Sequence, residues 1–190
     1  MTARPTAVVA GASGLIGRRI VERLLEDGGW DVIGLARRAQ LRPGVRWIAV
    51  DLADRADLER KLAGVAATHV FYAARYDHPV EGKTEDVDTN AAMLENLVQA
   101  MEAAGSLEHV HALHGSKWYG HQLGPVALPL EEDASSRAPG QNYYFVQDAF
   151  LRAASAGKNW GWSSSRPHAF CDPSVDLPRS IGLVIAVYAA

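Results

Sequence analysis

Hydrophobic positions recur along the chain in two patterns, short continuous runs and longer segments with apolar residues three or four positions apart. The short runs are typical of buried strands, and the longer segments are typical of helices that pack through one face. Six strands are predicted in this way, at residues 7–10, 30–35, 45–50, 68–74, 109–113 and 160–164. Helices are predicted at about residues 18–25, 54–63, 85–104 and 143–156.

This regular alternation of strands and helices indicates the fold class. Strands that are joined through helices pair in parallel by right-handed crossovers, which places helices on both faces of one sheet. We therefore expect an α/β fold, a doubly wound parallel sheet of the Rossmann type. With 190 residues and 48% hydrophobic composition, the chain can bury one substantial core. Residues 1–190 are accordingly expected to form a single domain.

The two ends of the chain carry different signals. Residues 1–5 lead straight into the first predicted strand, without the charged and then apolar pattern of a secretory leader. The single cysteine, Cys171, fits a reducing, cytoplasmic location. The apolar run at residues 181–190 falls well short of the roughly 20 residues that span a bilayer. It has no helix-stopping residue, so we expect the chain to end in mid-helix and its exposed apolar surface to favour homo-oligomers.

Charge restricts the expected partners. The formal net charge is -3 and both signs are mixed along the chain, so nucleic acid and anionic membranes are not expected partners. His109 and His111 share one face of a predicted strand, but no cysteine or carboxylate of that strand shares the face with them. We therefore predict no metal site. A small molecule is the partner that remains.

Three glycines, Gly11, Gly14 and Gly17, follow the first predicted strand at a spacing of three residues. In a loop that binds a pyrophosphate, the first glycine makes the turn and the second lets the backbone approach the phosphates. The third lets the following helix lie close to the strand. Free N–H groups and the positive end of the helix dipole then bind the anion. The motif predicts a dinucleotide site at this turn.

Two arginines bear on which dinucleotide is bound. NAD-preferring sites carry an acidic residue about 20 residues past the glycines, where it bonds the ribose hydroxyls. This chain has Arg37 and Arg38 at the end of the second predicted strand. Guanidinium groups bind a 2′-phosphate through charge-assisted, bidentate hydrogen bonds, although a solvated pair at a strand end is the alternative. We interpret the pair as a 2′-phosphate site and predict NADP(H) as the cofactor.

Reduction by NADPH requires a donor beside the oxygen that becomes negative as hydride arrives. A tyrosine hydroxyl near a lysine ammonium serves this purpose, and most short-chain dehydrogenases carry the pair as Tyr-x-x-x-Lys on one helix. Here Gln147 and Asp148 stand four residues after Tyr143 and Tyr144. Lys117 instead follows the fifth predicted strand directly. Because the carboxyl ends of parallel strands face the cofactor crevice, Lys117 is expected to point at the nicotinamide.

Further short motifs follow one another in order over essentially all 190 residues, at residues 34–38, 51–54, 68–72, 90–96, 115–120, 142–148, 165–167 and 187–190. Together with the glycine loop, they resemble those of the progesterone 5β-reductase/iridoid synthase-like family of atypical short-chain dehydrogenases. One departure lies after Pro167, where the chain continues with His168 and Ala169 instead of the family's Gly-Asn.

The resemblance implies an NADPH-dependent reductase that acts on the C=C bond of activated enones. It makes Lys117 the catalytic lysine and Tyr143 the catalytic tyrosine, which stabilises the enolate oxygen. The family also has a longer C-terminal part that supplies much of the substrate pocket, so this chain is expected to bind cofactor but to turn over poorly. The expected cofactor-binding residues are Gly11, Ser13, Gly14, Leu15, Ile16, Gly17, Arg37, Arg38, Asp51, Leu52, Ala73 and Pro167.

Two alternatives stay open. One is an extended dehydrogenase of the nucleotide-sugar epimerase/dehydratase type, although this chain lacks the strand-end serine and the Tyr-x-x-x-Lys spacing of those enzymes. The other is a catalytically silent NADP-sensing or regulatory protein. Such a protein would require the glycine loop with Arg37 and Arg38, but not Lys117 and Tyr143.

Overall fold

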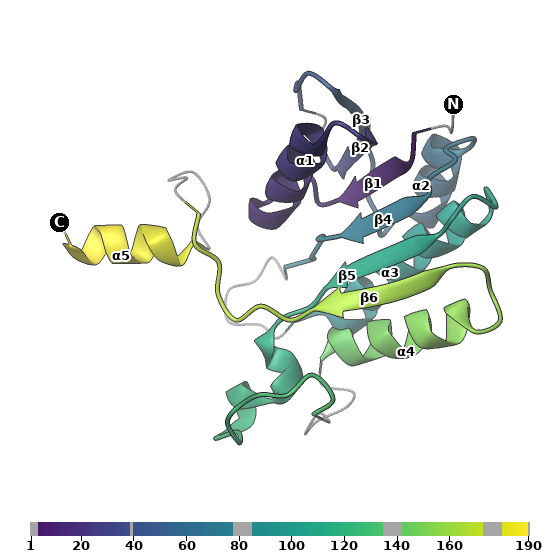
Figure 1. The fold of residues 1–190 in the computed structure, drawn as a ribbon. Helices are drawn as coiled ribbons and strands as arrows, with labels where there is room; N and C mark the ends of the chain where they lie inside the picture. Colours follow the sequence, from purple (N-terminus) through teal and green to yellow (C-terminus); the bar gives the residue numbers. More distant parts are fainter. Residues whose placement is uncertain (1–3, 39, 78–84, 135–141, 173–179, 190) are drawn as a thin grey trace.

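A computed structural model describes residues 4–38, 40–77, 85–134, 142–172 and 180–189. Its centre is one sheet of six parallel strands in the order β3-β2-β1-β4-β5-β6 (Figure 1). The order reverses between β1 and β4, which places a crevice at the carboxyl ends of these two strands. The predicted fold class is thus confirmed. The strands are β1 (Thr6–Ala10), β2 (Asp31–Ala36), β3 (Val45–Ala49), β4 (His69–Tyr72), β5 (His109–Leu113) and β6 (Gly161–Ser165).

Helices cover both faces of the sheet. The α-helices are α1 (Leu15–Asp27), α2 (Arg55–Leu62), α3 (Val87–Glu102), α4 (Tyr143–Ser155) and α5 (Ile181–Ala189), and two 3₁₀ turns are formed by Ser116–Tyr119 and His121–Leu123. Successive side chains of β1 point to opposite faces, as in any strand. Val8 and Ala10 pack in the larger core with residues of α2, α3 and α4. Ala7 and Val9 pack instead with Val21 of α1.

The helix starts differ in a way that positions the site. Asp54 caps α2 by accepting a hydrogen bond from the Asp57 amide, and Asn142 caps α4 by accepting one from the Tyr144 amide, both at 3.0 Å. Such caps each contribute about 1 kcal/mol. Helix α1 begins at Leu15, and the residue at its N-cap position, Gly14, has no side chain to form a cap. Its first amides therefore remain available to a ligand.

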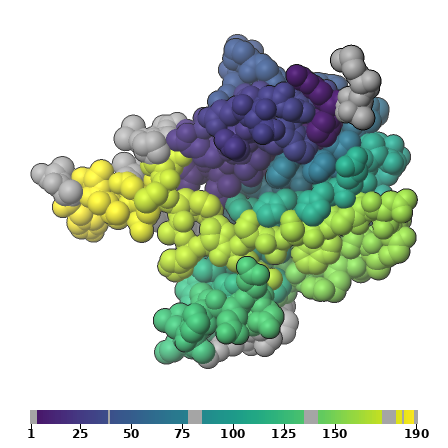
Figure 2. Space-filling view, viewed as in Figure 1, coloured from purple at the N-terminus to yellow at the C-terminus, as the bar shows by residue number. Residues whose placement is uncertain are grey.

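Helix α5 projects away from the sheet (Figures 1 and 2). Its apolar residues Ile185, Val187 and Tyr188 are exposed, in agreement with the exposed apolar surface expected for residues 181–190. Residues 1–3 and 190, on which the predictions for the two chain ends partly rest, lie outside the described residues. In the described part of the chain, no helix combines the length and apolarity needed to cross a membrane.

Candidate functional site

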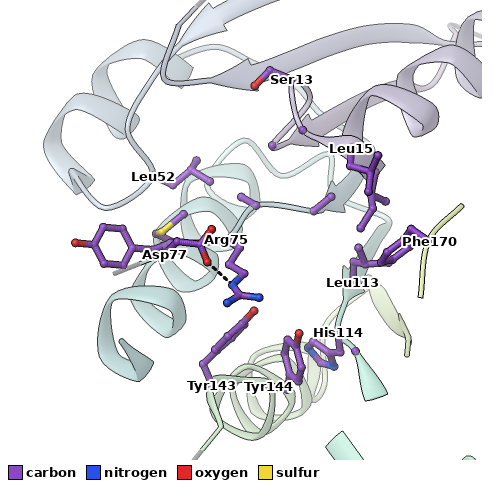
Figure 3. Close-up of a pocket in the computed structure, with 18 of the residues that line it drawn as sticks. Ser13, Leu15, Leu52, Arg75, Asp77, Leu113, His114, Tyr143, Tyr144 and Phe170 are labelled. Atoms are coloured by element: carbon purple, nitrogen blue, oxygen red, sulfur yellow. Dashed lines mark ion pairs between the residues drawn. The ribbon is translucent and has the colours of Figure 1, made fainter. Parts of the chain in front are cut away.

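A cavity of about 840 Å³ opens at the carboxyl ends of the strands (Figure 3). It is lined by the glycine loop, the segments that follow β2, β3, β4 and β5, the start of α4, and the segment that follows β6. This is the crevice in which an open parallel sheet binds its ligand. Two of the predicted cofactor residues, Gly17 and Arg38, do not line it. The ten that do are Gly11, Ser13, Gly14, Leu15, Ile16, Arg37, Asp51, Leu52, Ala73 and Pro167.

At two of its three glycines, the glycine loop has no room for a Cβ, because other backbone atoms of the protein lie too close. Gly11 has a φ of +74°, and a Cβ there would lie 2.7 Å from the Ala73 carbonyl oxygen. A Cβ on Gly17 would lie only 2.1 Å from the Gly11 carbonyl oxygen. Gly11 therefore makes the turn and Gly17 permits the close approach of α1, as the spacing predicts. That Gly14 lets a phosphate approach the backbone stays a prediction.

The start of α1 supplies donors for an anion. The first intrahelical bond runs from the Arg18 amide to the Gly14 carbonyl oxygen at 3.0 Å. The amides of the first helical turn before Arg18 thus have no intrahelical acceptor, as at every helix start. Leu15 and Ile16 of this turn line the cavity. Free amides and the positive end of the helix dipole fit a pyrophosphate at this place.

Two arginines mark the far end of the same cavity. Arg37 lines it, whereas Arg38 lies beside it, and both side chains are exposed. Neither forms an ion pair within the described ranges of the chain. Asp51, an acidic residue of the lining, accepts a hydrogen bond from the Ala53 amide at 3.0 Å. Its carboxylate is thus engaged in shaping the turn after β3.

Tyr143 opens α4 and faces the cavity from its floor (Figure 3). Only 3% of the residue is exposed. Burial and the neighbouring Tyr144 raise the pKa of its hydroxyl well above the usual value, with the Arg75 guanidinium acting in the opposite direction. The hydroxyl therefore stays protonated at neutral pH and can donate a hydrogen bond to a ligand.

Lys117 also lines the cavity, but its ammonium is bound by a carboxylate. Its Nζ lies 2.7 Å from Glu85 Oε1, and Arg75 Nη2 lies 3.1 Å from the same oxygen. Arg75 follows β4, and its guanidinium stands next to the Tyr143 hydroxyl (Figure 3). The structure thus brings an unpredicted arginine to Tyr143. Whether Tyr143 and Lys117 are catalytic stays a prediction.

Tyr144 and His114 are further lining residues that sequence reasoning missed. The Tyr144 hydroxyl lies 3.0 Å from the place where a Cβ on Gly115 would stand, so the missing side chain of Gly115 makes room for it. The His114 and Tyr144 rings lie 4.9 Å apart. Burial lowers the pKa of His114 to about 4, and its imidazole is therefore neutral at pH 7. The sequence offered one signal that Tyr144 lines the site, namely its position next to Tyr143.

Gln147, which stands where the dehydrogenase lysine would follow Tyr143, does not reach the cavity. It is buried, and its Nε2 donates to the Asn90 carbonyl oxygen at 2.8 Å. The Asn90 amide group bonds the backbone of Tyr76 in both directions, at 2.8 and 3.0 Å. Asn90 therefore fixes the segment that follows β4.

The wall after β6 is tied to α1. Asp172, whose side chain is 4% exposed, accepts from Arg18 Nη2 at 2.7 Å and from Arg19 Nε at 2.6 Å. Closer to the cavity, the Ser116 amide donates to the Pro167 carbonyl oxygen at 3.2 Å. These contacts fix the segment that contributes Pro167 and Phe170 to the lining of the cavity.

The histidines on β5 have structural partners. His109 Nε2 and His111 Nδ1 both lie within 2.9 Å of Ser163 Oγ, and His111 Nε2 lies 2.6 Å from Ser165 Oγ. Across the ranges that the structure describes, no group of histidine, cysteine and acidic side chains has the geometry of a metal site.

Comparison with known proteins places this site in a family context. Residues 7–149 match the model of the NAD dependent epimerase/dehydratase family. The short chain dehydrogenase gsfE of Penicillium aethiopicum is 32% identical over 96% of this chain and 52% of its own length. The short chain dehydrogenase sirS of Leptosphaeria maculans is 28% identical over 97% of this chain and 54% of its own length. The chain thus spans about half the length of these two relatives.

A solved structure with the same fold is that of UDP-glucose 4-epimerase from Thermus thermophilus, in complex with NAD. It is 25% identical in sequence and superimposes with a TM-score of 0.75 over 97% of this chain and 61% of that one.

Proposed function

The chain belongs to the NAD-dependent epimerase/dehydratase family of extended short-chain dehydrogenases, and we propose that it is an NADPH-dependent reductase of activated C=C bonds in enones. Within the family, we place it with the progesterone 5β-reductase/iridoid synthase-like enzymes. We also propose that residues 1–190 form one NADP-binding domain. The observation that carries the proposal is the position of Tyr143, which faces the cavity with the Arg75 guanidinium beside its hydroxyl (Figure 3).

The residues present fit the cofactor. The uncapped start of α1 suits the pyrophosphate, and the close backbone contacts of Gly11 and Gly17 leave the loop no side chain to block it. Arg37 and Arg38 carry exposed guanidinium groups at the end of β2, which suits the 2′-phosphate of NADP(H) and not the ribose hydroxyls of NAD. Bound NADPH supplies the hydride, which is received by the β-carbon of the enone.

The chain's own residues act on the oxygen of the substrate. As hydride reaches the β-carbon, the electron pair of the C=C bond moves to the carbonyl oxygen and gives an enolate. Tyr143 donates a hydrogen bond to this oxygen, and the positive charges of Arg75 and Lys117 stabilise the negative charge. Uptake of one proton at the α-carbon then completes the saturated ketone.

The test is the oxidation of NADPH with cyclohex-2-enone, followed at 340 nm for the wild type and for Tyr143→Phe. Loss of a donor to a developing oxyanion lowers turnover by about 10²–10³, while NADPH affinity changes little because the hydroxyl acts in the transition state. Tyr144→Phe is the matched control on the adjacent residue. A larger loss with Tyr144→Phe would move the catalytic role to Tyr144. Tight NADPH binding without oxidation of any enone would favour the NADP-sensing alternative.

A second candidate function is the epimerase chemistry of the Thermus thermophilus relative. Its family membership favours it, whereas the buried Gln147 in place of a cavity lysine disfavours it. Incubation with NAD⁺ and UDP-glucose distinguishes the two, because an epimerase forms UDP-galactose without net oxidation of cofactor. Formation of that product would replace the reductase proposal.

A further inference from the structure

Two cationic side chains converge on the substrate end of the cavity from different loops. Arg75 follows β4 and Lys117 follows β5, and both line the cavity near Tyr143. The whole of α3 lies between them in the sequence, so the fold alone brings them together. In Figure 3 the Arg75 guanidinium points into the space above Tyr143.

One carboxylate oxygen holds the two cations in place. Glu85 Oε1 lies 2.7 Å from Lys117 Nζ and 3.1 Å from Arg75 Nη2. The Glu85 side chain is only 15% exposed, and Glu85 is not among the residues that line the cavity. It therefore lies behind the two cations, which keep their other sides toward the ligand space.

Asp77 is the second acidic partner of Arg75, and it also lines the cavity, in a more solvated position than Glu85. Its Oδ1 lies 2.9 Å from Arg75 Nε, and its side chain is 51% exposed. Water screens an ion pair of such exposure. Arg75 Nη1 has no hydrogen-bond acceptor among residues 4–38, 40–77, 85–134, 142–172 and 180–189. The guanidinium thus keeps a nitrogen that can donate to a ligand.

We propose that Arg75, assisted by Lys117, forms an anion subsite, and that the preferred substrates of this protein are enones that carry a carboxylate. The proposal rests on the proposed function, because it names the substrate class of the same site. A planar guanidinium presents paired donors to a carboxylate in a geometry that a neutral amide or ester cannot match. Arg75, Lys117 and Tyr143 line the same cavity, so a carboxylate on the substrate would share its ligand space with both cations.

The experiment compares two probes of nearly the same size, the charged 4-oxocyclohex-2-ene-1-carboxylate and its neutral carboxamide. Binding of each is measured by calorimetry with NADP⁺ present, so that no hydride is available. The wild type binds the carboxylate at least about tenfold more tightly than the carboxamide, and the preference shrinks at high salt. Arg75→Gln brings the two affinities to within about twofold. Arg152→Gln, which removes an exposed arginine on α4, leaves the preference unchanged.

Equal binding of the two probes by the wild type would overturn the subsite, as would a preference that survives in Arg75→Gln. A second readout separates the subsite from a role of Arg75 in enolate stabilisation alone. In that case Arg75→Gln would slow the reduction of both probes by NADPH equally, and the binding preference would be absent from the start. If the wild type prefers the carboxylate but oxidises NADPH with neither probe, the subsite stands and the reductase proposal fails.

Discussion

The two ends of the cavity are built by different means. At the glycine loop the protein offers backbone amides from one short segment, Gly11 to Gly17, which packs on the Ala73 carbonyl oxygen after β4. At the opposite end it offers side chains that arrive from separate loops and meet only in the folded sheet, among them Arg75, Lys117 and Tyr143. The first end is set by local conformation, and the second by long-range packing.

This difference predicts how each end responds to change. An end made of backbone tolerates almost no added atom, because the neighbouring atoms are themselves backbone and cannot move aside. An end made of side chains can lose or exchange single groups and keep its shape. Substitutions at the glycine loop should therefore affect folding and cofactor affinity together, whereas those at the substrate end should separate the two.

The largest effect is expected from Gly17→Ala. The new Cβ would meet the Gly11 carbonyl oxygen at 2.1 Å, which forces α1 away from the loop. We expect a loss of about 2–3 kcal/mol in the free energy of unfolding together with loss of measurable NADPH binding. Denaturant titration and calorimetry measure the two. The matched control is Gly29→Ala, whose Cβ would meet only the Asp27 side chain at 3.3 Å. Native-like NADPH affinity in Gly17→Ala would contradict the idea that the glycine loop tolerates no added atom.

The next effect concerns acid stability at the substrate end. Burial lowers the pKa of His114 to about 4 from an unfolded value of 6.5. In the unfolded chain, His114 is therefore protonated below about pH 6.5, whereas in the folded protein it is protonated only below about pH 4. Stability is accordingly lost as pH falls through this window, by about 2 kcal/mol at pH 5. Burial also lowers the pKa values of His109 and His111, which adds loss of the same sign.

The measurement is the free energy of unfolding at pH 7.5 and pH 5 for the wild type and His114→Gln. The variant should lose less stability between the two values, because one depressed pKa is removed. An unchanged difference would show that His114 does not titrate as its burial requires.

At the phosphate end, replacing both Arg37 and Arg38 by Ala should weaken NADPH binding by at least about tenfold, or roughly 1.4 kcal/mol. NADH affinity should change little, since it lacks the 2′-phosphate. The single variants sharpen the test, because only Arg37 lines the cavity. Arg37→Ala should account for most of the loss in a calorimetric titration. Equal losses for NADPH and NADH would reject a 2′-phosphate site.

The same contrast explains which features could be predicted from the sequence. The glycine loop and the starts of α2 and α4 depend on residues a few positions apart, and their patterns are visible in the sequence. The parallel sheet with helices on both faces follows from alternation and right-handed crossovers, whereas the strand order does not. Arg75 carried no such signal, because its meeting with Glu85 and Tyr143 depends on how three separate elements pack. Tyr144 was not predicted, because the place of its hydroxyl depends on the missing side chain of Gly115, a residue that is distant in the sequence.

The smallest effect uses two helix caps of the same kind at different distances from the cavity. Asn142 caps α4, which carries Tyr143 and Tyr144, and Asp54 caps α2, which contributes no residue to the cavity lining. Replacing either cap by Ala leaves an amide at the helix start without its acceptor. Each variant should therefore lose about 1 kcal/mol in the free energy of unfolding.

The two cap variants should nevertheless differ in ligand binding. Without its cap, the first turn of α4 frays, and the hydroxyl of Tyr143 loses its fixed place beside Arg75. Binding of 4-oxocyclohex-2-ene-1-carboxylate should weaken about threefold to tenfold in Asn142→Ala, since even part of a lost hydrogen bond has this effect. Asp54→Ala should bind the same probe like the wild type, and NADPH affinity should be unchanged in both. Equal weakening in both variants would mean that the substrate end responds to global stability and not to the placement of its side chains.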